Sequence, residues 1–168
     1  ILDHHLYTGL AGTAGEAGHM IVQPGGRSCP CGNHGCLEQY ISEPAVLSRY
    51  RELSGRTTVS IDDLVWSYNQ KEADALAVVD EFTTYLACGI NNLWNLFSPE
   101  CIILNSQLTA YLPQLLPEIL QKLSARFRAT CQLKLSTLQD TGVLLGAARV
   151  CISKYLGIEK LYFSGFQP

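Results

Sequence analysis

Three cysteines and one histidine lie in a glycine-rich segment, and this cluster restricts the fold more than any other feature of the sequence. Cys29, Cys31 and Cys36 follow His19, and residues 9–35 hold eight of the fourteen glycines. Glycine loses more conformational freedom on folding than any other residue, so such a segment does not hold one conformation unaided. We therefore expect a loop that a bound metal ion orders.

Zinc is the metal that this ligand set favours. Zn²⁺ takes four nitrogen or sulfur ligands in tetrahedral geometry, and three thiolates with one imidazole leave no position for water. We predict a structural zinc site formed by His19, Cys29, Cys31 and Cys36, with His34 as the alternative to His19. A Cys29–Cys31 disulfide would be strained, and an iron–sulfur cluster normally requires a fourth cysteine.

The composition predicts a folded protein with one substantial core. The chain has 168 residues, of which 47% are hydrophobic and 16% charged, and its net charge is -3. A chain of about this length buries roughly 70% of its unfolded surface. The weakly acidic charge provides no basic field for nucleic-acid phosphates, so we expect DNA binding only through a domain outside this chain.

The other four cysteines occur singly in apolar segments, and this distribution is typical of a reducing compartment. We expect Cys88, Cys101, Cys131 and Cys151 to fill the core, without a catalytic role. The chain shows no signal-peptide pattern and no uncharged apolar run of about 18 residues. A soluble, cytoplasmic protein without membrane contact is therefore expected.

Helical and strand patterns alternate after residue 38 and predict an α/β fold. Apolar residues recur every three or four positions in residues 73–97, which predicts the longest helix with one apolar face. Further helices are predicted over residues 45–53, 60–68, 109–129 and 141–155, and strands over residues 20–22, 101–104 and 133–136. The run at 101–104 is expected to be buried on both faces. Residues 1–9 have the pattern of the end of a hairpin.

Several motifs together resemble the ROK family of repressors, open reading frames and sugar kinases. They are GTAGEAGH at residues 12–19, CPCG at 29–32 and GCLE at 35–38. The similarity continues through NLFSPECII at 95–103 and GAA at 146–148, so it covers nearly the whole chain.

The resemblance implies an actin-like, ribonuclease-H-like ATPase-type fold of two α/β lobes. Residues 1–168 would form a single C-terminal lobe, with a zinc and sugar-site loop at about 9–38 and a helical and α/β part at about 39–168. In sugar-binding members of the family, residues that match Glu16, His19 and Glu38 contact sugar hydroxyls.

Carboxylates and a metal-held imidazole suit a sugar chemically. An ionised carboxylate accepts hydrogen bonds from two vicinal hydroxyls, and such charge-assisted bonds are strong. Zinc on one ring nitrogen of His19 would fix the angle of the other. Without the resemblance, Glu16 would be interpreted as a cap in a glycine turn, and Glu38 as a carboxylate placed at a helix start by the helix dipole.

The resemblance leaves three functions open. Kinases of the family use an N-terminal phosphate loop and an Asn-Asp pair with a general-base aspartate, and this sequence contains neither, so the chain alone is expected to be inactive and to hold no catalytic residue. Kinases also carry Gly-Gly where this chain has Asn105-Ser106-Gln107. The favoured interpretation is a sugar-responsive transcriptional regulator of the N-acetylglucosamine and xylose repressor type. A glucokinase-like or fructokinase-like sugar kinase and a zinc-stabilised interaction module are the alternatives.

The expected partners follow from this interpretation. They are a small sugar or sugar-phosphate effector, and further copies of the chain in a homodimer or tetramer. Trp94 and residues 112–123 present more apolar surface than one lobe can easily cover, which favours dimerisation. The aromatic tail at residues 156–168 is expected to pack against a neighbouring lobe.

Overall fold

The computed structural model describes residues 2, 5–138 and 141–157, and within it the chain forms two compact units. The large unit is Ala17–Thr137, and the small unit combines Ile1–Glu16 with Leu138–Pro168. Among the described residues, no helix combines the length and apolar character that crossing a bilayer requires.

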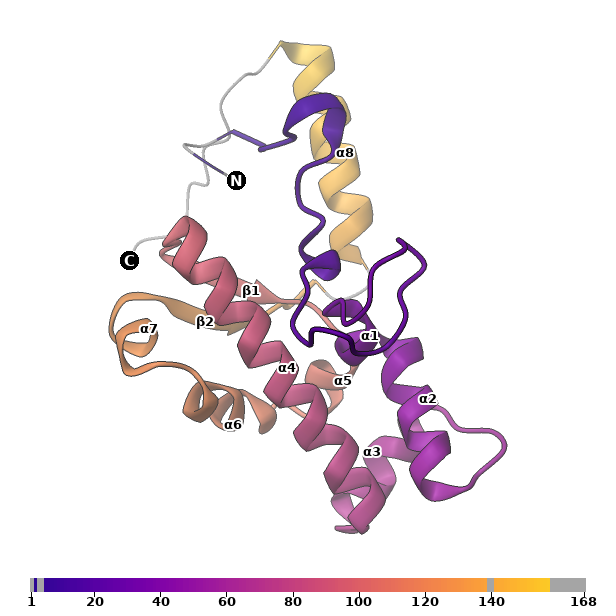
Figure 1. Ribbon diagram of the computed structural model, residues 1–168. Helices are drawn as coiled ribbons and strands as arrows, with labels where there is room; N and C mark the ends of the chain where they lie inside the picture. Colours follow the sequence, from indigo (N-terminus) through magenta and orange to yellow (C-terminus); the bar gives the residue numbers. More distant parts are fainter. Residues whose placement is uncertain (1, 3–4, 139–140, 158–168) are drawn as a thin grey trace. The chain divides into compact units, whose positions relative to one another are not determined.

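A single long helix, α4 (Ala73–Phe97), organises the large unit. Its bounds confirm the prediction from the apolar repeat. The helices α1 (Glu38–Ile41), α2 (Glu43–Ser54) and α3 (Ile61–Asn69) contact α4, and α2 and α3 lie beside its N-terminal half (Figure 1).

Side-chain caps begin α2 and α3. The Ser42 hydroxyl accepts a hydrogen bond from the Ala45 N–H at 3.4 Å at the start of α2. At the start of α3, Ser60 and Asp63 form a reciprocal capping box, in which the Ser60 N–H donates to the Asp63 carboxylate at 2.8 Å. These caps satisfy donors that have no partner within the helix.

Two parallel strands, β1 (Cys101–Leu104) and β2 (Gln132–Leu135), confirm the predicted α/β character. Cys101 pairs with Gln132, and Leu104 pairs with Leu135. The prediction that β1 is buried on both faces is wrong, because Ile103 is 58% exposed.

The connection between the strands corrects the prediction of one helix over residues 109–129. It contains three helices, α5 (Gln107–Tyr111), α6 (Leu115–Lys122) and α7 (Ala125–Thr130). Leu112 precedes a proline and leaves the helical region at φ -121° and ψ 65°, because the proline ring disfavours the helical conformation there. Ser124 then caps α7 through the Phe127 N–H at 3.1 Å.

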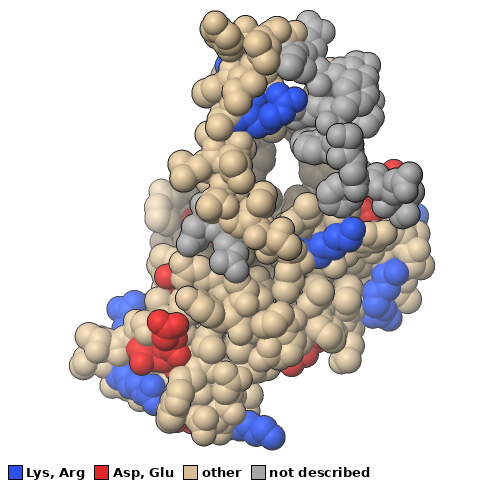
Figure 2. Space-filling view, turned by 180° about the vertical axis from the view of Figure 1, so that it is seen from behind, with Lys and Arg blue, Asp and Glu red and all other residues tan. Residues whose placement is uncertain are grey.

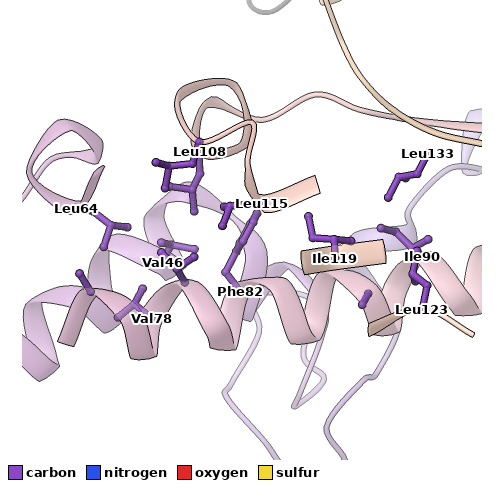
Figure 3. Packing of buried hydrophobic residues seen from close by; sticks show 14 of the residues in the cluster. Val46, Leu64, Val78, Phe82, Ile90, Leu108, Leu115, Ile119, Leu123 and Leu133 are labelled. Atoms are coloured by element: carbon purple, nitrogen blue, oxygen red, sulfur yellow. The ribbon is translucent and has the colours of Figure 1, made fainter. Parts of the chain in front are cut away.

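The core lies between α4 and the elements that contact it (Figure 3). Val78, Phe82 and Ile90 project from α4 into this core, and Trp94 meets the Phe127 ring edge-on at 5.9 Å between ring centroids. The predicted apolar face of α4 is only partly right, because Leu76 is 40% exposed.

The apolar residues that were expected to exceed what one lobe can cover are buried inside the large unit. Trp94, Leu112, Leu115, Ile119 and Leu123 are each at most 6% exposed. Ordinary burial therefore accounts for them, and they no longer favour dimerisation. The oligomeric state stays a prediction.

The small unit contains a short 3-10 helix, Leu10–Gly12, and α8 (Thr141–Leu156), which confirms the predicted last helix. The sequence offers Asp140 or Thr141 as the cap of this helix, and Asp140 lies outside the described residues, as does most of the tail at 156–168. The hairpin expected in residues 1–9 is represented by one antiparallel bridge between Leu2 and His5.

The four single cysteines differ in burial. Cys131 is buried as predicted, and Cys88 and Cys101 are half-buried. The core assignment is wrong for Cys151, which is exposed. None of the described residues of α8 is buried.

Candidate metal centre and adjoining cleft

The metal loop, residues 19–38, is held by short backbone pairings instead of the strand predicted at residues 20–22. Ile21 forms an isolated antiparallel bridge with Cys36, and Ser28 forms one with His34. Inside the Ser28–His34 bridge, at the tip of the loop, the Cys29 N–H donates to the Asn33 carbonyl at 2.9 Å. These pairings fold the loop back on itself and bring its cysteines together.

Two glycines permit the reversals. Gly32 has φ +95° and Gly35 has φ +81°, a region that other residues rarely adopt. A Cβ on Gly35 would also lie 2.6 Å from the carbonyl carbon of Gln23 and closer still to its oxygen. The chain therefore passes Gly35 at a distance that only glycine allows.

The four predicted metal ligands converge at one point. One ligand atom from each of His19, Cys29, Cys31 and Cys36 lies within 4.8 Å of all the others. The Cys29 Sγ is 3.6 Å from the His19 Nδ1, and the Cys31 Sγ is 3.6 Å from the Cys36 Sγ. Tetrahedral zinc with bonds of about 2.0–2.3 Å requires ligand separations of roughly 3.5–3.8 Å, so these two pairs match that spacing and the group could hold a metal ion. The structure brings His19, and not His34, into this group.

The three thiols differ in environment. Cys29 and Cys36 are buried, whereas Cys31 is exposed. A hydrogen bond to the Glu38 carboxylate raises the pKa of Cys29 to about 12, and burial raises the pKa of Cys36. The backbone N–H of Asn33 lowers the pKa of Cys31, which makes it the most readily ionised of the three.

Glu38 adjoins the ligand cluster as the first residue of α1. Its Oε1 accepts a hydrogen bond from the Cys29 thiol at 3.0 Å and lies 3.6 Å from the His19 Nδ1. The Cys29 hydrogen bond is the main reason that the pKa of Glu38 is lowered. Glu16 is an exposed residue of the small unit, and its sugar contact stays a prediction.

Arg27 anchors the metal loop, and sequence reasoning did not single it out. Its guanidinium donates to the Gln39 carbonyl at 2.8 Å and pairs with the Glu81 carboxylate of α4. It also lies over the Tyr40 ring, 4.5 Å from the centroid. An arginine inside the cysteine segment was the available signal, but its partners are 12 to 54 residues away in sequence.

A cleft of about 500 Å³ opens beside Glu38, and we call it the Glu38 cleft. Its volume is in the range of small-molecule sites. One wall comes from the metal loop, α1 and the start of α2, and another comes from α4 and the end of β1. The lining residues are Gly18, Glu38, Ile41, Ser42, Glu43, Phe82, Leu86, Ile103, Leu104, Asn105, Ser106, Gln107 and Thr109.

Comparison with known proteins gives consistent matches. A family model described as ROK family matches residues 1–154. The xylose repressor of Bacillus spizizenii is 32% identical over 165 residues, which cover 96% of this chain and 42% of the repressor. The N-acetyl-D-glucosamine kinase of Haemophilus influenzae is 28% identical over 167 residues, which cover 92% of this chain and 55% of the kinase.

A solved structure supports the same relationship. The crystal structure of a ROK family transcriptional regulator, described as a homologue of the E. coli MLC protein, aligns with a TM-score of 0.73 and 27% identity. The alignment covers 94% of this chain and 43% of that chain. The chain therefore spans roughly two fifths of the length of these two regulators.

Proposed function

The chain belongs to the ROK family, and from this premise we propose that it is the C-terminal, effector-binding and oligomerisation portion of a sugar-responsive transcriptional regulator. The observation that carries the proposal is the match to a xylose repressor along nearly the whole chain. The match to the solved regulator supports it independently.

The proposed effector site combines the metal loop with the Glu38 cleft. Zinc bound by His19 and the three cysteines would supply rigidity and no reaction chemistry, because the ligand set is complete. Nδ1 of His19 faces Cys29, so Nε2 is the atom we propose for a sugar hydroxyl. Glu38 would accept hydrogen bonds from neighbouring hydroxyls. The sugar contact of Glu16 is proposed from the family resemblance alone.

DNA binding would come from a domain outside this chain. The weak net charge of the chain supports this assignment. On the face that Figure 2 shows, basic and acidic side chains occur in small separate groups rather than in one basic field. Sugar binding would act by favouring one arrangement of subunits, and so one spacing of their DNA-binding domains.

A sugar kinase is the second candidate, because the N-acetyl-D-glucosamine kinase matches a comparable share of the chain. Residues 105–107 weigh against it. They follow β1 and belong to the lining of the Glu38 cleft, and Ser106 also caps α5 by accepting the Thr109 N–H at 3.2 Å. A glycine pair would leave that space to a nucleotide.

Two assays on the natural protein that carries this chain separate these functions. A gel-shift titration with its own promoter DNA should show binding that D-xylose, N-acetyl-D-glucosamine or D-glucose alters at saturation. A coupled assay for ADP release with the same sugars and ATP should show no turnover above background. Sugar-dependent ADP release without DNA binding would replace the regulator with the kinase.

A further inference from the structure

We infer that the Glu38 cleft selects an uncharged sugar and disfavours its phosphate ester. This inference rests on the proposed function, which leaves open whether the effector is a sugar or a sugar phosphate. The distinction matters because a free sugar and its phosphorylated form report different steps of sugar uptake and use. The inference follows from the charges of the residues that line the cleft.

Both charged residues in the lining are acidic. Glu38 lies at the metal-loop side of the cleft, and Glu43 lies at the start of α2. Within the part of the chain that the structure describes, the lining includes no lysine, arginine or histidine. Phosphate recognition in proteins relies on such cations or on clustered N–H donors, so this lining lacks the usual means of holding a phosphate.

A bound metal ion does not reverse this field. Zinc carries two positive charges, but three cysteine thiolates bring three negative ones, so the complete site keeps one net negative charge. Glu38 adds a further carboxylate within 3.0 Å of the Cys29 sulfur. The metal centre beside the cleft therefore repels a phosphate as well.

Three helices, α1, α2 and α5, begin in the lining, and helix N-termini bind phosphates. Glu38 is the first residue of α1, and the Ser106 hydroxyl caps α5 by accepting the Thr109 N–H at 3.2 Å. The start of α2 is the third. Glu43 already occupies the first turn of this helix, however, and its carboxylate interacts favourably with the helix dipole. The Ser42 hydroxyl also accepts the Ala45 N–H at 3.4 Å. This helix start is thus supplied with partners from its own chain.

The remaining lining suits a neutral polyhydroxy ligand. Ile41, Phe82 and Leu86 provide apolar surface for the C–H face of a sugar ring. Asn105 and Gln107 provide amide groups that can both donate to and accept from hydroxyls. A few polar groups on an apolar wall are typical of sites for small uncharged molecules.

The expected preference is large enough to measure. A phosphate in the cleft would meet the like charges of Glu38 and Glu43 in a partly desolvated site, where repulsion is stronger than in water. A free sugar should therefore bind about tenfold or more tightly than its phosphate ester. The preference should shrink as salt screens the charges.

The test is isothermal titration calorimetry on the natural protein that carries this chain. Three pairs of ligands are compared: D-glucose with its 6-phosphate, N-acetyl-D-glucosamine with its 6-phosphate, and D-xylose with its 5-phosphate. For any pair that binds, the inference expects the free sugar to bind more tightly. A phosphate ester that binds as tightly as its free sugar, or more tightly, overturns the inference and leaves the proposed regulator intact. If no member of any pair binds, the proposed function and the inference fall together.

A matched pair of variants assigns the effect to the cleft. Glu43→Gln removes one lining carboxylate without touching the metal ligands, and it should improve the affinity for the phosphate ester by roughly threefold or more. Asp62→Asn is the control, because it also removes a first-turn carboxylate but from α3, outside the cleft. Equal effects of the two variants on the phosphate ester would contradict the role of Glu43.

Discussion

Replacing Gly35 by alanine should loosen the metal loop more than any other single methyl group added to it. Gly35 has φ +81°, which costs an alanine about 1–2 kcal/mol. Its added Cβ would also overlap the Gln23 carbonyl, so the backbone must move. That movement breaks hydrogen bonds from Val22 N–H to the Gly35 carbonyl at 2.9 Å and from Gly35 N–H to the Arg27 carbonyl at 2.7 Å.

The total cost of Gly35→Ala is about 2–5 kcal/mol, taking roughly 0.5–1.5 kcal/mol for each hydrogen bond lost. Cys36 is the next residue, so the displacement reaches a metal ligand directly. If the cost falls on the metal-bound loop, zinc affinity should drop by about 30-fold or more. Competition with a chromophoric zinc chelator measures this affinity.

Gly32→Ala is the matched control for this prediction. Gly32 also has a positive φ, +95°, but a Cβ there meets nothing within 4 Å. It should cost only the conformational term, about 1–2 kcal/mol. Equal zinc affinities in the two variants would refute the claim that the close approach at Gly35 holds the loop.

Three further predictions concern the metal ligands, the core and a helix cap. Cys31→Ser should release about one zinc ion per chain, as measured by plasma mass spectrometry, and full retention of metal would contradict the ligand assignment. Phe127→Ala should lower the free energy of unfolding by about 3–5 kcal/mol in urea titrations, because the ring is fully buried against Trp94; a loss below 1 kcal/mol would contradict that packing. Hydrogen bonds from Ser60 hold the pKa of Asp63 below its ordinary value of 3.8, so this carboxylate stabilises α3 fully above that pH and loses the effect as the pH falls below it. Asp63→Asn should therefore reduce the acid sensitivity of unfolding followed by circular dichroism, and an unchanged pH profile would contradict the prediction.

Short sequence patterns correctly predicted the elements that interactions between nearby residues define. The apolar repeat of α4 runs unbroken, and the predicted bounds at Ala73 and Phe97 are those observed. The same reasoning failed over residues 109–129, because the effect of Pro113 on Leu112 outweighs an apolar repeat that continues past it. The apolar repeat indicates which face of a helix is apolar, but it does not indicate where the helix must end.

The candidate site was predictable only in part. Cysteine spacing indicated the candidate ligand cluster, but it left His19 and His34 open as the fourth member, and that choice depends on how the loop folds back. The contact between Glu38 and Cys29 and the anchoring by Arg27 depend on that same fold. The Glu38 cleft joins residues from Gly18 to Thr109, so no local pattern could have shown it.

The central proposal is that a loop held by a metal ion presents the groups that bind the sugar. Calorimetric titration of the natural protein with the sugar that alters its DNA binding, before and after removal of zinc by a chelator, tests this claim directly. We expect one zinc ion per chain and a loss of sugar affinity of at least tenfold when zinc is removed, with the affinity restored when zinc is added back. Sugar affinity that is unchanged in the zinc-free protein would contradict it.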